Sequence, residues 1–405
     1  MANFENPFRP GAGHPPPHLA GRQKERAEFL RLIGQKTILE NIVITGLRGV
    51  GKTVLMDSLK PEGIRGGWLW VGTDLSETTS ISEDNMAIRL CTDLALITSQ
   101  IMIYSSSIPA IGFTQDKKEV QTYLDFNTLH GIYQSTPGLS LDKLKTVIMF
   151  AWNAIHQATQ GSIRGIVFAY DEAQNLSDRS ERDQFPLSLI LDSFQSLQKQ
   201  GYPVMLLLTG LPTLFPKLVE ARTFSERMFR VLFLDSLTQA ESREAILKPI
   251  EQENCPLKLS EQSVKTIISM SDGYPYFIQF ICREVYEAFI QRIDSGQNVA
   301  VPVNEIEQKL DTDFFAGRWA KATDRQKALM IVIANLGNTH EFTVQEVASM
   351  SATLLEKPFS NSHVNQMLTT LNERGLIFRN RHGKYSFAVP LFDKYILRQA
   401  GKESS

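Results

Sequence analysis

Gly46-Leu-Arg-Gly-Val-Gly-Lys-Thr53 is the stretch of sequence that decides the fold. It matches the P-loop pattern G-x-x-x-x-G-K-[ST] at every fixed position. Glycines let successive main-chain N–H groups turn toward phosphate oxygens, and the positive end of a following helix strengthens the attraction. The lysine would neutralise charge on β- and γ-phosphates, and the threonine would bind Mg²⁺. The residues predicted to hold a nucleotide here are Gly46, Arg48, Gly49, Val50, Gly51, Lys52, Thr53 and Val54.

The sequence around this loop has the context that such a loop requires. Asn41-Ile-Val-Ile-Thr45 is typical of a buried strand, and Val54 to Leu59 opens a helix. Further strands, each separated from the next by helical segments, are predicted at Trp68–Val71, Ile166–Tyr170, Val204–Leu208 and Val231–Leu234. This alternation predicts an α/β fold with a mostly parallel sheet between two layers of helices.

Two carboxylates, Asp171 and Glu172, follow the predicted strand Ile166–Tyr170. In a parallel sheet the carboxyl ends of the strands meet at one edge, so this pair is expected near the loop. Asp171 would hold Mg²⁺ through water, and Glu172 would orient and deprotonate an attacking water molecule. Taken without the loop, the pair would be an ordinary acidic turn.

Other polar residues end or precede the neighbouring strands. The hydroxyl of Thr209 could contact a γ-phosphate or the attacking water, or it could belong to a simple Thr-Gly turn before Pro212. Arg222, Arg227 and Arg230 cluster before the last strand. An arginine at this place could reach the γ-phosphate of a neighbouring subunit, and Arg227 is the preferred candidate. A solvated charge on a helix is the alternative.

Together these motifs resemble AAA+ ATPases, and most closely the initiator-like and STAND-type bacterial ATPases with a C-terminal winged helix. The resemblance spans nearly the whole chain and also rests on Pro7–Arg9, Pro15–Pro17, Ala20–Arg22, Asp171–Gln174, Gly210–Pro212 and Gly273–Pro275. It implies a P-loop NTPase fold followed by a helical lid and a winged helix-turn-helix domain. It also implies ATP and Mg²⁺ as cofactors and hydrolysis of the β–γ phosphoanhydride.

The resemblance extends to residues outside the loop. It implies that the main chain at the Gly-Arg box contacts adenine, through Leu19, Gly21 and Arg22. It places Gly273 and Pro275 on the lid over the nucleotide. However, Gly273-Tyr-Pro275 stands where a replication initiator usually carries a sensor arginine, and the next arginine, Arg283, is a poor positional match. This departure favours a switch-like ATPase.

The chain is expected to contain five parts. These are an extended arm with the adenine-side box (1–22), the nucleotide-binding core (23–236), a helical lid (237–303), a connecting helix (304–321) and a winged helix (322–400). Lys52 and Asp171 are 119 residues apart, which is longer than the core needs, and an insertion at about 104–138 accounts for the excess. Long loops in compact domains are uncommon, so the insertion is expected to contact a partner or DNA, with a tolerated surface loop as the alternative.

Charge is distributed unevenly along the chain. The whole sequence has 42 Lys and Arg against 44 Asp and Glu, a net charge of −2, which excludes coating of nucleic acid by bulk charge. Residues 317–405 nevertheless hold 12 basic and 7 acidic residues, a net charge of +5. The basic excess lies around the predicted wing, at Arg374, Arg379, Arg381 and Lys384.

Three helices and a hairpin are predicted in this C-terminal part. Thr323–Gln326 and Thr343–Glu346 fit capping boxes, Ser360–Arg374 is the third helix, and the hairpin joins Leu376–Phe378 to Tyr385–Phe387. The wing, through Arg379, Arg381 and Lys384, would lie along DNA phosphates. The third helix would present Ser362, Asn365 and their neighbours His363 and Gln366 to a major groove. Winged helices that contact proteins are the alternative.

Several other classes of protein are excluded by composition. Cys91, Cys255 and Cys282 are far apart, so neither a zinc site nor a disulfide framework is predicted, and inert thiols are expected. No apolar run approaches the roughly 20 residues of a membrane helix, and residues 1–17 lack the apolar core of a signal peptide. The expected location is the cytoplasm.

Two functions remain open at this stage. The first is an ATP-hydrolysing AAA+ protein that forms a homo-oligomer with ATP and couples nucleotide state to double-stranded DNA through its winged helix. The second is a STAND-like signalling switch whose winged helix and insertion bind a protein partner. A loop that binds nucleotide only structurally conflicts with the intact Lys52, Thr53, Asp171 and Glu172.

Overall fold

The computed structural model describes residues 5–11, 13–108, 118–293, 301–337, 341–381 and 383–403. The chain divides into two compact units. The sheet unit comprises Gln23–Thr45 and Leu55–Phe233, and the lid unit comprises Met1–Arg22, Gly46–Val54 and Leu234–Ser405. The division into five parts expected from the sequence stays a prediction.

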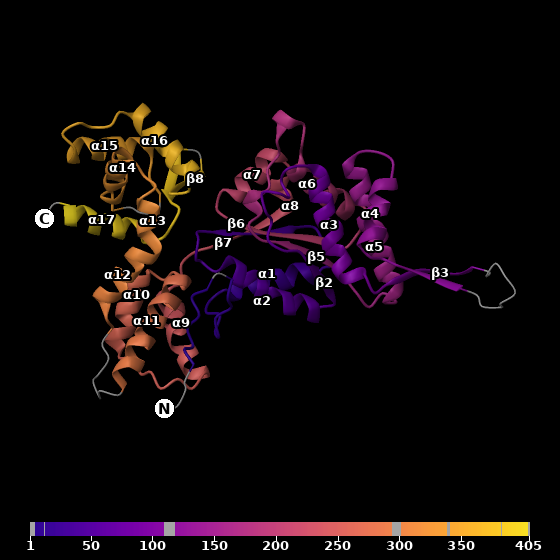
Figure 1. The fold of residues 1–405 in the computed structure, drawn as a ribbon, viewed down its shortest axis with the longest axis horizontal. Helices are drawn as coiled ribbons and strands as arrows, with labels where there is room; N and C mark the ends of the chain where they lie inside the picture. Colours follow the sequence, from indigo (N-terminus) through magenta and orange to yellow (C-terminus); the bar gives the residue numbers. More distant parts are fainter. Residues whose placement is uncertain are drawn as a thin grey trace. The chain divides into compact units, whose positions relative to one another are not determined.

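A five-stranded sheet forms the centre of the sheet unit (Figure 1). Its strands, in spatial order, are β2 (Trp68–Val71), β5 (Gly165–Tyr170), β6 (Val204–Gly210), β1 (Asn41–Gly46) and β7 (Phe229–Leu234). β2 pairs with β5, β5 with β6, and β6 with β1, always in parallel. Every residue of the three central strands is buried, as expected for a sheet covered on both faces. The α/β fold predicted from the sequence is confirmed.

Helices cover both faces of this sheet. Phe168 and its alternate neighbours on β5 pack in one apolar cluster with the helices α3 (Glu83–Thr98), α5 (Ser140–Ala158) and α6 (Pro186–Lys199). On the other face, the Trp68 indole N–H donates to the carbonyl of Ile33, the last residue of α1 (Gln23–Ile33), at 3.2 Å. Phe29 of the same helix meets Trp70 edge to face. Alternation along each strand thus divides the side chains between two helical layers.

The register of the sheet decides which residues meet at its carboxyl edge. Thr45 is aligned with Gly210, and Tyr170 with Leu208. Asp171, which follows Tyr170, and Thr209 therefore reach the same edge. β1 ends at this edge too, where Gly46 begins the glycine-rich loop and α2 (Lys52–Arg65) follows it.

The predicted insertion contains a β-hairpin. β3 (Met102–Ile108) and β4 (Lys118–Tyr123) pair antiparallel, and residues 109–117 lie outside the described part of the chain. The sequence did not predict the helix α4 (Phe126–Ser135), which packs on α3 and α5 through the fully buried Leu129. The remaining short helices of the sheet unit are η1 (Ala173–Asn175), η2 (Ser180–Arg182), α7 (Leu214–Ala221) and α8 (Ser225–Met228).

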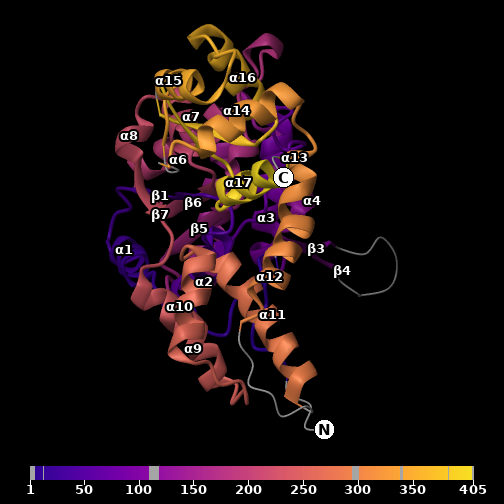
Figure 2. The ribbon, with the colours of Figure 1, turned by 90° about the vertical axis from the view of Figure 1, so that its left-hand side faces the viewer.

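Three helices, α9 (Gln239–Gln252), α10 (Glu261–Ser271) and α11 (Pro275–Ile293), pack against one another in the lid unit (Figure 2). The pattern Thr238-Gln-Ala-Glu241 predicts a capping box, and α9 begins at this capping box. The connecting helix continues through α12 (Val303–Leu310), the π-turn η3 (Asp311–Phe315) and α13 (Ala316–Trp319). The stretch Ser295-Gly-Gln-Asn298 is typical of a linker, and it lies outside the described residues.

The last part of the lid unit contains the elements expected of a winged helix. Its helices are α14 (Asp324–Ala334), α15 (Val344–Leu354) and α16 (Asn361–Glu373), followed by the hairpin of β8 (Ile377–Arg381) and β9 (Lys384–Phe387). Both predicted capping boxes are present. Phe342 adds a short third strand to the hairpin, because it exchanges two 2.8 Å main-chain hydrogen bonds with Tyr385. A final helix, α17 (Phe392–Glu403), was not predicted and packs on α14.

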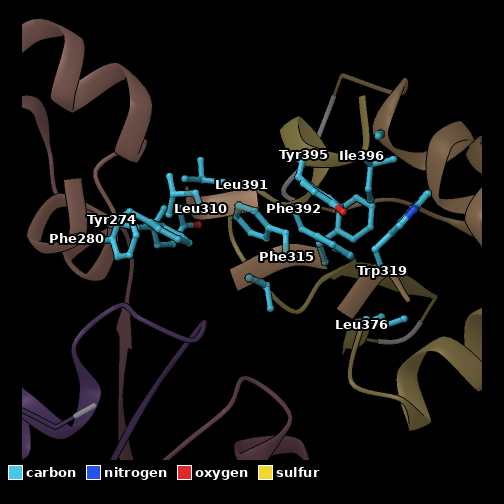
Figure 3. Packing of buried hydrophobic residues seen from close by; sticks show 14 of the residues in the cluster. Tyr274, Phe280, Leu310, Phe315, Trp319, Leu376, Leu391, Phe392, Tyr395 and Ile396 are labelled. Carbon is cyan, nitrogen blue, oxygen red and sulfur yellow. The ribbon is translucent and has the colours of Figure 1, made fainter. Parts of the chain in front are cut away.

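One apolar core joins the lid helices to this C-terminal part (Figure 3). Phe315 lies at the junction, with its ring centroid 5.9 Å from that of Phe392 and 5.3 Å from that of Tyr395. Trp319 meets Tyr395 edge to face. Phe315 and Phe392 are both fully buried, and each large aromatic side chain contributes roughly 3–5 kcal/mol to such a core. The lid and the C-terminal helices therefore form one packed body.

Candidate nucleotide site

The glycine-rich loop has a conformation that only glycine permits at its tight points. A Cβ atom on Gly46 would stand 2.5 Å from the carbonyl oxygen of Leu234. Gly49 has φ +77°, in the left-handed region. The Nζ atom of Lys52 folds back and donates to the carbonyls of Gly46 and Leu47, each at 3.0 Å. The lysine thus lies along the loop that the sequence predicts it to serve.

Arg22 fixes the loop from outside, which the sequence did not reveal. Its guanidinium donates to the carbonyl of Val50 at 3.0 Å and to that of Asp235 at 2.8 Å. The resemblance assigns only the main chain near this residue, to adenine. The only signal in the sequence was the Gly-Arg box itself. In the structure, Gly21 and Arg22 both have positive φ. The side chain of Arg22 therefore ties the loop to the chain segment that leads into the lid.

The Gly-Tyr-Pro segment of the lid lies against the loop. The main-chain N–H of Tyr276, the second residue of α11, donates to the carbonyl of Gly49 at 3.1 Å. Gly273, with φ +72°, packs against the segment before α9 and not against the loop, because a Cβ atom there would stand 2.4 Å from the carbonyl oxygen of Leu237. Pro275 opens α11. Sequence reasoning placed Gly273 and Pro275 on the lid but missed Tyr276.

Tyr276 also connects the loop to the connecting helix. Its ring stacks on Phe314 with a centroid distance of 5.3 Å, and burial raises the pKa of its hydroxyl. The guanidinium of Arg318 lies over the same Phe314 ring, with its carbon atom 4.5 Å from the ring centre. Burial, and next the positive charge of Arg48, lower the pKa of Arg318. Cationic and aromatic side chains from three segments therefore meet beside the loop.

In the sheet unit, Asp171 is fixed by two donors. Its Oδ1 atom accepts hydrogen bonds from the Thr209 hydroxyl and from the main-chain N–H of Glu172, the latter at 2.7 Å. The Asp171 side chain is only 3% exposed and Thr209 is fully buried. Thr209, predicted to contact a phosphate or water, is here engaged with the carboxylate beside it.

Glu172 differs from its neighbour in exposure and conformation. It is exposed, and its backbone has φ +50°, an uncommon conformation for a residue other than glycine. Its carboxylate accepts a hydrogen bond from the amide of Gln174. Strained backbone positions of this kind cluster at functional sites. The carboxylate of the candidate catalytic base is thus accessible to solvent and is hydrogen-bonded to Gln174.

The three candidate arginines have different surroundings. Arg222 forms a forked ion pair with Asp192, with contacts of 2.8–3.1 Å. Arg230 pairs with Glu28 at 3.0 Å and also contacts Glu40. The guanidinium of Arg227 is exposed and makes no hydrogen bond or ion pair within the part of the chain that the structure describes. Arg227 is therefore the one of the three that is not held by an acid of its own unit.

The predicted ligands of Mg²⁺ belong to different units, Thr53 to the lid unit and Asp171 to the sheet unit. Mg²⁺ typically takes one or two protein oxygens and completes its shell with phosphate oxygens and water. A hydroxyl and a carboxylate are oxygen donors of this kind, and their role stays a prediction. Among the described residues, no three His, Cys, Asp or Glu side chains gather as a metal site.

The candidate DNA-binding residues lie on α16 and the hairpin of the C-terminal part. Ser362 and Asn365 are exposed on α16, and the Tyr385 hydroxyl donates to Asn365 at 3.4 Å. Arg379 is exposed on β8, Lys384 begins β9, and the side chain of Arg381 lies outside the described residues.

Part of the predicted basic excess is engaged in hydrogen bonds within the chain, although it is exposed. Arg374 donates to the carbonyl of Lys321 at 2.6 Å and to the Gln326 amide at 3.0 Å, so it joins the end of α16 to the start of α14. Hydrogen bonds from Thr343, and to a smaller extent the charge of Lys384, lower the pKa of Glu346.

The cysteines match their expected character. Cys91 and Cys282 are buried, Cys255 is half-buried, and all three are free. Burial raises the pKa of the Cys91 thiol to about 12, so this side chain is un-ionised at neutral pH. No helix among the described residues is long and apolar enough to span a bilayer.

Comparison with known proteins agrees with this geometry. A Walker-type ATPase of Pyrococcus abyssi has a similar structure, with 14% sequence identity, a TM-score of 0.57 and coverage of 94% of this chain and 96% of that one. The ORC2 protein of Aeropyrum pernix in its ADPNP–ADP form is similar at 13% identity and a TM-score of 0.50, with 97% of this chain and 98% of that chain covered. Both comparisons cover nearly the whole of each chain, and they confirm the α/β fold of the P-loop NTPase type predicted from the sequence.

Sequence comparisons cover less of the chain. A family profile described as a domain of unknown function (DUF8462) matches residues 312–396, from the π-turn η3 to α17. A search of the curated proteins gives no significant match.

Proposed function

We propose that this chain is an AAA+ ATPase that binds and hydrolyses ATP with Mg²⁺ and couples its nucleotide state to double-stranded DNA through its C-terminal winged helix. The hydrogen bond from Tyr276 to Gly49 carries the proposal. It attaches the candidate phosphate-binding loop to the packed body that contains the candidate DNA-binding elements. A change in the loop therefore has a direct contact through which it reaches that body.

The candidate catalytic residues have distinct tasks in this proposal. Lys52 and the N–H groups of the loop neutralise phosphate charge, and Thr53 and Asp171 would hold Mg²⁺. Bound Mg²⁺ would offset the negative charge that develops during phosphoryl transfer. Glu172 orients the attacking water and takes its proton. The Thr209 hydroxyl orients Asp171, which keeps that carboxylate in a fixed position.

The path from the loop to the C-terminal part consists of packed aromatic side chains. Tyr276 stacks on Phe314, Phe314 meets Phe315 edge to face at 5.2 Å, and Phe315 contacts Phe392 and Tyr395. Packed cores move between discrete arrangements and do not deform continuously. A shift of Tyr276 would therefore reposition the helices that present Ser362 and Asn365.

Assembly of several copies completes the proposed site. Arg227 is exposed and is not paired within its own unit, whereas Arg222 and Arg230 are paired. An arginine supplied by a neighbouring subunit stabilises the charge of phosphoryl transfer. We therefore propose that the protein forms a homo-oligomer with ATP in the cytoplasm and that Arg227 acts in trans.

Turnover and binding assays test this function together. Wild-type protein should hydrolyse ATP only with Mg²⁺, and Lys52→Ala should lose nucleotide binding. Glu172→Gln should bind ATP normally and lose at least about 100-fold in turnover, because it lacks the general base. Lys60→Ala, which removes the same charge from an exposed position on α2, is the matched control for Lys52. ATP binding and turnover by Lys52→Ala equal to those of Lys60→Ala would contradict the proposal.

A STAND-like signalling switch is the second candidate function. Two observations favour it, namely the Gly273-Tyr-Pro275 segment where a sensor arginine would stand, and the hairpin of β3 and β4 with α4, which offers a partner surface. Gel shifts on random duplex DNA at low salt, with and without ATP, separate the two functions. An absence of any shift, together with slow ATP turnover, would favour the switch.

A further inference from the structure

Gln174 stands between the candidate general base and the end of a neighbouring strand. Its side-chain amide nitrogen donates to the carboxylate of Glu172. Its side-chain oxygen accepts a hydrogen bond from the main-chain N–H of Leu211, at 3.1 Å, directly after β6. All three residues belong to the sheet unit. One side chain thus connects the exposed carboxylate to the strand that also supplies Thr209.

The orientation of this amide is determined by its two partners. An N–H group of Leu211 can only donate, so it must face the amide oxygen of Gln174. The NH₂ group then points to Glu172, whose ionised carboxylate can only accept. The two hydrogen bonds therefore fix which way the Gln174 amide faces.

Two further contacts fix Gln174 in place. A Cβ atom on Gly210 would stand 2.6 Å from the Gln174 side-chain oxygen, so the end of β6 leaves room for the amide only because this residue is glycine. The ammonium group of Lys217, on α7, donates to the main-chain carbonyl of Gln174 at 2.7 Å. Burial lowers the pKa of Lys217, which indicates that this contact is shielded from water. The amide is thus held from its main chain and from its side chain.

We propose that Gln174 is a positioning residue that holds Glu172 in its orientation and couples it to the end of β6. The inference rests on the proposed function, in which Glu172 is the general base. Thr209 fixes Asp171 from the same strand end. The segment Thr209–Leu211 therefore positions both carboxylates. The Thr209 hydroxyl donates to Asp171, and the Leu211 N–H holds the Gln174 amide that donates to Glu172. A displacement of this segment would move the metal-binding carboxylate and the base together.

Two nearly isosteric variants separate a positioning role from a structural one. Gln174→Glu keeps an acceptor for the Leu211 N–H but loses the donor to Glu172. Gln174→Met loses both interactions. We expect both variants to lower kcat by about 10- to 100-fold with ATP affinity within about threefold of wild type.

If Gln174 serves only to shape the turn after β6, Gln174→Glu should behave like wild type and Gln174→Met alone should fail. Wild-type kcat in Gln174→Glu would therefore overturn the inference. Circular dichroism and thermal unfolding check that each variant is folded.

Glu172→Gln separates failure of the inference from failure of the proposed function. Equal turnover by wild type and Glu172→Gln would overturn the proposed function itself. A large loss of turnover in Glu172→Gln, together with wild-type kcat in Gln174→Glu, would overturn the inference and leave the proposed function standing.

Discussion

The main-chain N–H of Tyr276 and the carbonyl of Gly49 form a 3.1 Å hydrogen bond between the lid and the glycine-rich loop. The two residues are also in close steric contact, because a Cβ atom on Gly49 would lie 3.0 Å from the Cβ of Tyr276. Position 49 thus has both a left-handed backbone and a fixed neighbour. The loop is shaped by the lid as well as by its own glycines.

Gly49→Ala should therefore weaken nucleotide binding. An alanine at φ +77° costs about 1–2 kcal/mol, and its methyl group displaces Tyr276, so we expect roughly a tenfold or greater loss in ATP affinity. Titration calorimetry with ATP and Mg²⁺ measures it. Gly131→Ala is the matched control, since a Cβ at Gly131 in α4 meets open space. Equal affinities in the two variants would contradict the role of the contact.

Arg227→Ala should abolish the dependence of ATP turnover on protein concentration. Loss of an arginine supplied in trans typically costs about 10³-fold in turnover, and mixing with Glu172→Gln protein should restore part of it. The control is Arg222→Ala, which breaks the ion pair with Asp192 inside one unit and should leave the concentration dependence intact. Turnover by Arg227→Ala that still rises with concentration would argue against the trans role.

Arg379→Ala should reduce the salt dependence of DNA binding. Each phosphate contact contributes about 0.9 to the slope of log K against log salt concentration, so one lost contact should lower the slope by about that amount. Arg243→Ala, which removes an equal charge paired with Glu261 on the lid, serves as control. Asn365→Ala should alter sequence preference and leave the slope unchanged. Fluorescence anisotropy over a salt series gives both quantities.

The buried hydroxyl of Tyr170 makes the free energy of unfolding depend on pH in the alkaline range. The Tyr170 hydroxyl donates to Asp93 at 2.8 Å, Asp93 is fully buried, and Arg89 pairs with it. Burial, followed by the charge of Asp93, raises the pKa of Tyr170 well above 10. A raised pKa means that the stabilisation is complete below the unfolded value, near pH 10, and is lost as the pH rises above it.

Urea unfolding between pH 8 and pH 11 checks this dependence. Wild-type protein should lose stability above about pH 10, and Tyr170→Phe should lose less over the same range because it has no hydroxyl to ionise at this position. Tyr202→Phe, at a half-buried position, is the control. Equal slopes for wild type and Tyr170→Phe would contradict the assignment.

Local patterns predicted most of the elements and only part of the candidate site. The apolar run of β1, the glycine-rich loop and the capping boxes at Thr238, Thr323 and Thr343 are local features, and each is present as predicted. α4 and α17 were missed. α4 lies in a stretch of broken periodicity, and its packing partners α3 and α5 are distant in sequence. Propensity alone is a weak guide where tertiary contacts stabilise a helix.

Tyr276, Gln174 and the side chain of Arg22 show why the rest of the candidate site could not be predicted. Tyr276 contacts a loop more than 220 residues earlier, and Arg22 donates to carbonyl groups at Val50 and Asp235. Every residue has a main-chain carbonyl whatever its side chain, so the residue types in the sequence do not indicate which carbonyls accept these hydrogen bonds. Gln174 was visible only as part of a motif, and its two hydrogen bonds arise from the register between β5 and β6.

The sequence by itself determined the P-loop, the α/β class and the order of helices and hairpin at the C-terminus, because spacing and periodicity are properties of the local chain. Tertiary structure alone decided which polar groups serve one another. Thr209 donates a hydrogen bond to Asp171, and Arg222 and Arg230 form ion pairs with acids of their own unit. The lid contacts the loop through the main-chain N–H of Tyr276. The physical reason is that hydrogen bonds and ion pairs act over a few ångströms, and only folding brings such residues within that range.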